Sequence, residues 1–119
     1  MKSILIFVLL FIQAEIYSQK GIIKVDVMTF TELTSEDKVQ LLDVRTSKEY
    51  KKGNIEGSIN IDYWEPGFIE LVKSTFDKSR PLYIYCAGGG RSGMASENLK
   101  KKGFKLIYDL EGGYEAYKE

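Results

Sequence analysis

One cysteine and one arginine, five positions apart, carry the clearest chemical potential in this sequence. Cys86 is the only cysteine of the 119 residues, and it directly follows an alternating apolar and aromatic stretch, residues 82–85, that favours a β-strand. Helical spacing runs over residues 92–102, so Cys86 and Arg91 bound a tight strand-to-helix loop. A thiol at the start of a helix faces unpaired backbone N–H groups and the positive end of the helix dipole, and both favour the thiolate. The pattern therefore predicts a reactive cysteine.

The residues between Cys86 and Arg91 favour an anion site. Three consecutive glycines leave the centre of the loop without side chains, so its backbone N–H groups can point at one position. Arg91 adds a permanent positive charge, which either attracts an anionic substrate or ties the loop to a nearby carboxylate. Ser92 is expected to cap the following helix. The predicted binding loop consists of Ala87, Gly88, Gly89, Gly90 and Ser92.

The absence of histidine restricts the chemistry. It excludes Cys–His pairs, Ser–His–Asp triads and histidine zinc sites, and the single cysteine excludes thiolate metal clusters. We therefore expect no metal site and no cofactor, and activation of Cys86 must come from the helix terminus, the loop amides and Arg91. The 17 basic and 17 acidic residues balance, which gives no reason to expect nucleic acid or an anionic membrane surface as a partner.

The first 18 residues are typical of a secretory signal peptide. Lys2 precedes an unbroken apolar run over residues 4–12, and the sequence turns polar from Gln13. The best cleavage site follows Ser18, which leaves residues 19–119 as a single neutral domain. The alternatives are a short core helix or an uncleaved anchor, but the apolar run is shorter than the roughly 20 residues that span a bilayer. We expect an exported, periplasmic protein that has no membrane contact after cleavage.

Strands alternate with helices along the rest of the chain, which predicts an α/β domain with a mainly parallel sheet. In such sheets ligands bind at the carboxyl ends of the strands, where Cys86 falls. The expected strands cover residues 22–25, 39–44, 58–61, 82–85 and 104–108.

The expected helices are placed by their caps and their apolar spacing. Thr29 and Glu32 form a capping box for a brief helix over residues 30–33, Ser47 caps one turn that reaches residue 50, and Pro66 opens a further helix. A last helix starts at residue 114. The buried face of the helix after the cysteine loop is expected to carry Met94, Ala95, Asn98 and Leu99.

Five separated blocks together resemble the successive signatures of the rhodanese, or sulfurtransferase, domain. The resemblance spans residues 25–117 and implies a three-layer α/β/α domain with a mainly parallel five-stranded sheet. It further implies a double displacement, in which a donor such as thiosulfate leaves a sulfur on Cys86 as a persulfide and a thiol or cyanide removes it. The blocks are LLDVR at 41–45, EY at 49–50, GNIEGSINI at 53–61, CAGGGRS at 86–92 and LEGG at 110–113.

The length of the cysteine loop distinguishes the rhodanese pattern from that of the cysteine-based phosphatases. Cysteine-based phosphatases have five residues between the cysteine and the arginine (C-x5-R), whereas four residues separate Cys86 from Arg91 (C-x4-R). The shorter ring suits a sulfur atom better than a tetrahedral phosphate. The first hypothesis is thus a sulfurtransferase. The second is a sulfur carrier or protein-binding module with little turnover, and the third is a phosphatase or arsenate reductase.

Further side chains are placed near the loop by the resemblance. Asp43 is expected to brace loop amides and Arg45 to pair with Glu49, although participation in catalysis is also possible. Tyr63 and Trp64 either line the mouth of the pocket or belong to the core. The sequence departs from the family pattern at Asn54, Glu56 and Tyr117. The expected partners are a small sulfur-anion donor, a thiol or cyanide acceptor and a periplasmic thiol reductant. The protein itself is expected to be a monomer.

Overall fold

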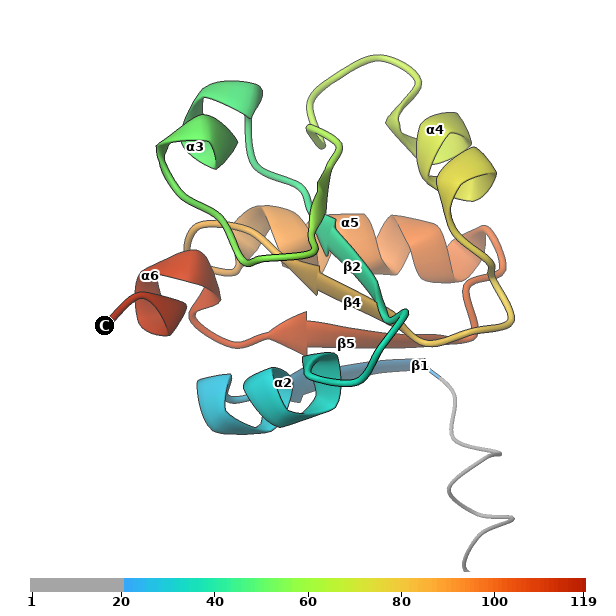
Figure 1. Ribbon diagram of the computed structural model, residues 1–119. Helices are drawn as coiled ribbons and strands as arrows, with labels where there is room; N and C mark the ends of the chain where they lie inside the picture. The colour runs from blue at the N-terminus through green and yellow to red at the C-terminus, as the bar shows by residue number, and fades with distance from the viewer. Residues whose placement is uncertain (1–20) are drawn as a thin grey trace, which may run out of the picture.

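The computed structural model describes residues 21–119 as an α/β fold around one five-stranded sheet (Figure 1). The expected signal peptide, residues 1–18, lies outside the described residues. The strand order is β1-β5-β4-β2-β3, and every pairing is parallel. The strands are β1 (Gly21–Val25), β2 (Gln40–Asp43), β3 (Ile59–Asn60), β4 (Leu82–Tyr85) and β5 (Leu106–Leu110); the helices are α2 (Val27–Thr34), α3 (Ser47–Lys52), α4 (Phe68–Thr75), α5 (Gly90–Lys101) and α6 (Gly113–Tyr117).

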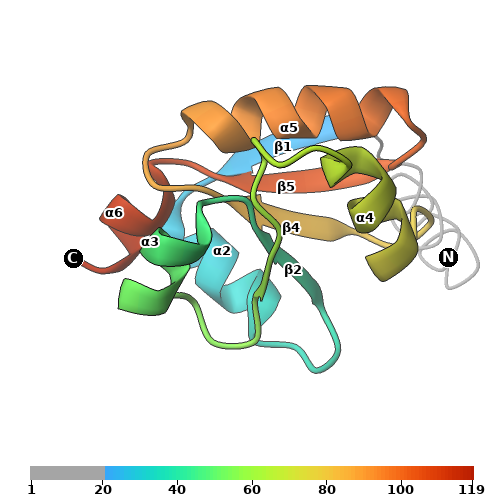
Figure 2. The same cartoon turned by 90° about the horizontal axis from the view of Figure 1, so that it is seen from above.

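Helices cover both faces of the sheet, and this confirms the three-layer arrangement. Figure 2 shows α5 and α2 on opposite sides of the central strands. Leu82 and Ile84 of β4 pack with α4 and α5, whereas Tyr83 and Tyr85 pack with Phe30 of α2. Because neighbouring side chains of a strand point to opposite faces, a strand covered on both sides must be apolar throughout. All four residues of β4 are indeed buried.

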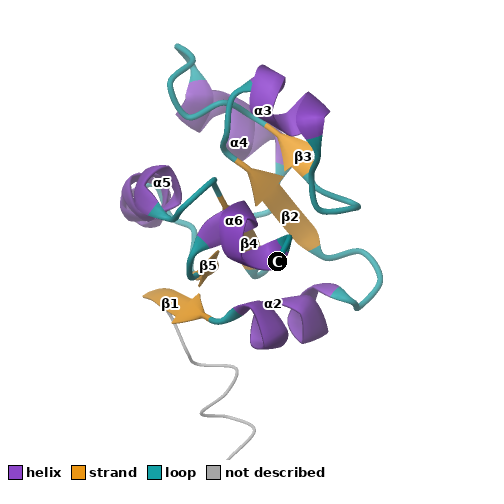
Figure 3. Ribbon diagram, turned by 90° about the vertical axis from the view of Figure 1, so that its left-hand side faces the viewer, coloured by secondary structure: helices purple, strands orange, loops and turns teal. Residues whose placement is uncertain are grey.

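The short helices α3 and α6 lie beyond the carboxyl ends of β4 and β5, where the residue after β4 is Cys86 (Figures 1 and 3). The sequence-based placement of the cysteine between a central strand and a helix is therefore confirmed. Within residues 21–119, no helix combines the length and the apolar character needed to cross a bilayer.

Two helix caps differ from the prediction. Helix α2 is capped by Asp26, whose Oδ1 accepts the N–H of Thr29 at 2.8 Å, so the helix begins before the predicted Thr29 cap. Helix α3 is capped by Thr46 rather than Ser47, and Thr46 forms a reciprocal capping box with Glu49. In both cases an oxygen-bearing residue slightly upstream takes the extended backbone conformation that a cap needs.

Other element boundaries also shift. Helix α4 begins at Phe68, two residues beyond the predicted Pro66. Helix α5 begins at Gly90, so Ser92 lies inside its first turn and is not the cap. Met94 is exposed and was wrongly assigned to the buried face of α5, whereas Ala95 and Leu99 are buried. Strand β5 extends to Leu110, beyond the predicted end at residue 108.

The turn between β5 and α6 packs directly against the backbone that follows β4. Gly113 has a φ of +60°, and a Cβ at this position would lie 2.5 Å from the carbonyl oxygens of both Cys86 and Ala87. Glycine is therefore needed at residue 113 for two reasons, namely its left-handed backbone and the close approach of the loop.

We predict that Gly113→Ala lowers the free energy of unfolding by about 2 kcal/mol or more, because it adds a backbone clash to the cost of a left-handed alanine. The matched control is Gly57→Ala, since Gly57 has a φ of +87° but open space around its Cβ position. This control should lose only about 1 kcal/mol. Urea denaturation measures both values, and equal losses in the two variants would contradict the close approach at residue 113.

Candidate functional site

Cys86 places its sulfur at the amino end of α5, inside the loop. Its side chain is buried, with 1% of the residue exposed. The N–H of Gly89 donates to Sγ at 3.0 Å, and Sγ lies 3.5 Å from Oγ of Ser92. Gly89 has a φ of +111°, a left-handed conformation that turns its amide toward the sulfur. The glycine run predicted several backbone donors at one point; among the described residues, the N–H of Gly89 is the one that donates to Sγ.

Helix α6 holds the other side of the loop. The N–H of Tyr114 donates to the carbonyl oxygen of Cys86 at 2.8 Å, and the N–H of Glu115 donates to that of Ala87 at 3.0 Å. In a trans peptide the C=O and N–H point in opposite directions. Fixing these two carbonyls toward α6 therefore turns the N–H groups of Ala87 and Gly88 away from it.

Arg91 is tied to a carboxylate. Its two terminal nitrogens donate to Oε1 and Oε2 of Glu49 at 2.7 and 2.9 Å, which joins α5 to α3. The hydrogen bond from Arg91 is the main reason why the pKa of Glu49 falls from 4.5 to about 2, and the same bond raises the pKa of Arg91. Oε1 of Glu49 also accepts from the backbone and the hydroxyl of Thr46, both at 3.0 Å. Of the two roles weighed for Arg91, the tie to a carboxylate is confirmed.

The expected pairing of Arg45 with Glu49 is wrong. Arg45 instead binds Asp43, with Nη2 donating to Oδ2 at 2.7 Å, and it donates to the carbonyl of Gly53 at 2.7 Å. Oδ1 of Asp43 accepts from the backbone N–H of Arg45 at 2.9 Å, so Asp43 braces the turn after β2 and not the cysteine loop. Both side chains are buried, and Glu49 is already occupied by Arg91.

Arg45 reaches the cysteine loop through aromatic rings. Its guanidinium lies 4.4 Å from the ring centroid of Tyr114 and 5.5 Å from that of Tyr85. A buried cation over two rings is favourable because the ring faces are electronegative. The Asp43–Arg45 pair therefore supports α6 and β4, the two elements on either side of the loop backbone.

Two hollows border the loop. The first has a volume of about 320 Å³, and the residues that line it are Lys24, Gly88, Gly89, Gly90, Asp109, Leu110, Glu111 and Gly112. The second has a volume of about 250 Å³, and its lining consists of Arg45, Glu49, Lys52, Gly53, Ala87, Tyr114, Glu115 and Lys118. Three cationic side chains face two carboxylates in the second hollow, so its lining carries a positive balance. Groups of His, Cys, Asp and Glu that could hold a metal ion are absent from the described residues.

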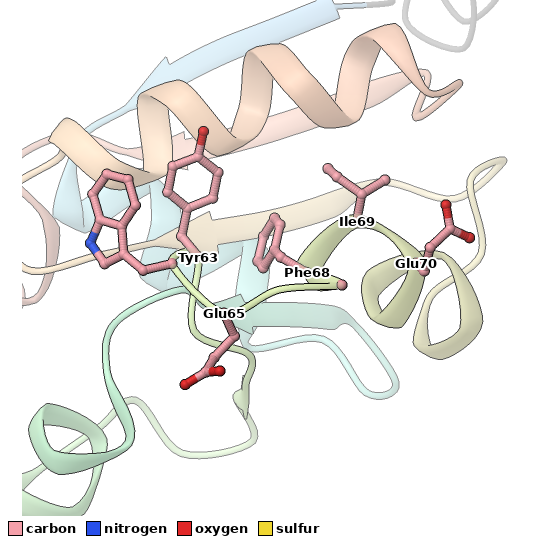
Figure 4. A pocket seen from close by; sticks show the side chains of 7 residues that line it. Tyr63, Glu65, Phe68, Ile69 and Glu70 are labelled. Atoms are coloured by element: carbon pink, nitrogen blue, oxygen red, sulfur yellow. The ribbon is translucent and has the colours of Figure 1, made fainter.

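Tyr63 and Trp64 belong to a separate surface hollow of about 380 Å³, whose lining residues all come from the segment 63–70 (Figure 4). Tyr63 packs partly on the core, with its ring edge-on to Phe68, and its hydroxyl accepts from Asn98 at 2.7 Å. Trp64 is 61% exposed. The core reading is therefore correct for Tyr63 and wrong for Trp64, and neither residue lines a hollow that the cysteine loop shares.

Sequence reasoning missed several residues beside the loop. Lys52 and Lys118 line the second hollow, and Asp109 is a buried carboxyl of β5 that lines the first. Asp109 fell outside the strand predicted for residues 104–108. A signal was present, because the apolar Leu110 after Asp109 continues the buried pattern of the strand.

Comparison with known proteins agrees with this geometry. The family model "Rhodanese-like domain" matches residues 27–119. A curated relative, thiosulfate sulfurtransferase 16, chloroplastic, of Arabidopsis thaliana, is 38% identical over 85 residues, which cover 64% of this chain and 71% of that protein. The tRNA uridine(34) hydroxylase of Chlamydia felis is 35% identical over 91 residues, but the match covers 72% of this chain and only 28% of that protein.

Solved structures give the same result. The rhodanese-like domain protein of Staphylococcus aureus superposes with a TM-score of 0.68 at 29% identity, covering 80% of this chain and 90% of that one. Because the matched region starts at the first residue of α2 and includes Cys86 with its whole loop, the chain belongs to the family of rhodanese-like domains.

Proposed function

We propose that this chain is a sulfurtransferase that carries sulfur as a persulfide on Cys86. The observation that supports this most directly is the position of Sγ at the start of α5, with the N–H of Gly89 at 3.0 Å. A negative sulfur at this point is favoured by the backbone donor and by the helix dipole. The same surroundings favour the thiolate before transfer and the persulfide after it.

The proposed reaction has two displacements. In the first, a lone pair of the Cys86 thiolate attacks the outer sulfur of thiosulfate, the donor S–S bond breaks, and sulfite leaves with the bonding pair. In the second, a thiolate or cyanide attacks the outer sulfur of the persulfide, and Cys86 leaves as the thiolate. Neither displacement transfers a proton, so a protein without histidine can carry out both steps.

The second hollow is our proposed entry for the anionic donor. Lys52 and Lys118 line it together with Ala87 of the cysteine loop, and Arg45 also lines it although Asp43 neutralises its charge. Arg91 contributes less net attraction, because Glu49 neutralises its charge through two hydrogen bonds. Its proposed role is to hold the start of α5 against α3, with Glu49 as the supporting residue.

A sulfur carrier with little turnover is the second candidate, and the burial of Cys86 favours it. Because only 1% of Cys86 is exposed, access of a donor to Sγ is restricted, which favours slow turnover. A phosphatase is disfavoured, since C-x4-R is one residue short and Arg91 is engaged by Glu49 rather than free for phosphate.

The cellular setting stays a proposal that rests on the sequence alone. Residues 1–18 have the composition of a signal peptide, so we propose that the mature domain works outside the cytoplasm with an external thiol reductant and as a monomer. The mass of the mature chain from a secreting host tests the export. A chain that starts at Gln19 agrees with it, and a chain that retains residues 1–18 contradicts it.

The experiment that tests sulfur transfer is thiocyanate formation from thiosulfate and cyanide. Cys86→Ser should lower the rate at least about a hundredfold, because serine offers no polarisable nucleophile at this position. Ser74→Ala is the matched control, since Ser74 is exposed on α4 and its hydroxyl donates to the carbonyl of Leu71 in the same helix. It should retain full activity. Equal rates for wild type and Cys86→Ser would refute the proposed function.

The Glu49–Arg91 pair predicts a pH-dependent stability. The pKa of Glu49 in the fold is about 2, below its ordinary 4.5, so the pair stabilises fully above about pH 4.5 and loses its effect as the pH falls toward 2. Glu49→Gln should therefore be less stable than wild type at neutral pH, and this difference should shrink steadily below pH 4.5.

Chemical denaturation at neutral pH and near pH 3 measures this difference. Glu70→Gln is the control, because Glu70 lies 3.7 Å from Lys73 in an exposed pair that contributes little. A Glu49→Gln deficit that stays constant between the two pH values would show that the carboxylate charge does not stabilise the loop.

A further inference from the structure

The second hollow beside the cysteine loop is lined by five charged side chains, but most of their charges cancel in pairs. Its cations are Arg45, Lys52 and Lys118, and its carboxylates are Glu49 and Glu115. Nζ of Lys118 lies 3.7 Å from Oε2 of Glu115, so the two charges that α6 contributes compensate each other. The other three charges come from α3 and from the turn after β2.

Arg45 and Glu49 are also paired, each with a residue outside the lining. Nη2 of Arg45 donates to Oδ2 of Asp43 at 2.7 Å, and both side chains are buried. Glu49 accepts two hydrogen bonds from Arg91, at 2.7 and 2.9 Å. Because each pair has no net charge, its attraction for an ion falls off with distance faster than that of a single charge.

Lys52 is the lining residue whose charge stays uncompensated. The ion pairs found among residues 21–119 do not include it. Its side chain is exposed at the last residue of α3, and the next residue, Gly53, also lines the hollow. The lining and its paired residues therefore carry one net positive charge, which Lys52 supplies.

We propose that Lys52 is a specificity-determining residue, whose charge raises the reactivity of Cys86 toward small anions relative to neutral molecules of similar size. Ala87 lines the same hollow and directly follows Cys86 in the chain. Tyr114 also lines it, and the N–H of Tyr114 donates to the Cys86 carbonyl at 2.8 Å. A single charge acts over about 10 Å in about 0.1 M salt, so contact between Lys52 and the sulfur is not needed.

The first displacement explains why such a residue matters. An anionic donor that approaches a thiolate is repelled, because the two charges have the same sign. Lys52 offsets this repulsion, whereas it has no comparable effect on a neutral donor. Arg45 and Arg91 cannot replace it, since carboxylates neutralise both. The inference rests on the proposed function, and it names the class of donor, a small anion, and the residue that selects it.

The test compares the rates at which iodoacetate and iodoacetamide alkylate Cys86, measured by intact mass. The two reagents are similar in size, but only iodoacetate is an anion. In both reactions the thiolate attacks the CH2 carbon, an S–C bond forms, and iodide leaves with the bonding pair. Because both reagents need the same thiolate, the ratio of the two rates does not depend on how much of Cys86 is ionised. Cys86 is the only cysteine, so one alkyl group is expected.

We expect Lys52→Gln to lower the ratio of the iodoacetate rate to the iodoacetamide rate about threefold at low salt, and Lys52→Glu to lower it about tenfold. Lys51→Gln is the matched control, because Lys51 is exposed beside Lys52 on α3 and its side chain lies outside the hollow. This control should keep a ratio close to that of wild type. About 0.5 M salt should bring the ratios of all four proteins together, since it screens exposed charges.

Equal ratios in wild type and Lys52→Gln would overturn the inference. An equal fall in Lys51→Gln would also overturn it, because it would show a general effect of protein charge. If neither reagent alkylated Cys86, the inference would fail as well, since the hollow would give no access to the sulfur. These outcomes are distinguishable from a failure of the proposed function. Alkylation requires no sulfur transfer, and thiocyanate formation tests transfer whatever the role of Lys52.

Discussion

Two backbone hydrogen bonds from the start of α6 decide the shape of the cysteine loop. They hold the carbonyls of Cys86 and Ala87, and they require the Gly113 backbone to pass so close that no side chain fits. With these carbonyls turned outward, the loop keeps its amides for a sulfur anion. The glycines between Ala87 and Arg91 then close the loop onto α5, where the N–H of Gly89 meets Sγ. A strand, two helix starts and one tight turn thus converge on one sulfur atom.

Buried and half-buried ion pairs hold the frame around this loop. Glu49 neutralises Arg91, and Asp43 neutralises Arg45, so neither arginine presents a free charge to a ligand. The Glu49–Arg91 pair joins α3 to α5, whereas the Asp43–Arg45 pair braces the turn after β2. Lys118 lies 3.7 Å from Glu115, so net attraction of an anion then depends mainly on Lys52, which lines the same hollow. Rim charges act over longer distances and are screened by salt, so they guide a donor without fixing it.

The main features of the fold could be predicted from the sequence because they depend on local signals. The apolar run before Cys86, the glycines after it and the alternation of strands with helices all act over a few residues. The choice of ion-pair partners could not be predicted, because Asp43 and Glu49 are both close to Arg45 in the sequence, whereas the Arg91 that binds Glu49 is 42 residues away from it. Thr46 and Ser47 are both able to cap α3, and the backbone conformation selects Thr46. Asp109 was missed because a carboxyl normally marks the end of a strand, whereas here the strand continues and buries it.

The central claim is that the loop holds a negative sulfur bound to Cys86. Intact-mass measurement of the reduced protein after exposure to thiosulfate, without an acceptor, tests it most directly. The account predicts a gain of one sulfur atom, located on Cys86 by fragmentation, absent in Cys86→Ser and removed by cyanide. An unchanged mass, or the same gain in Cys86→Ser, would contradict it.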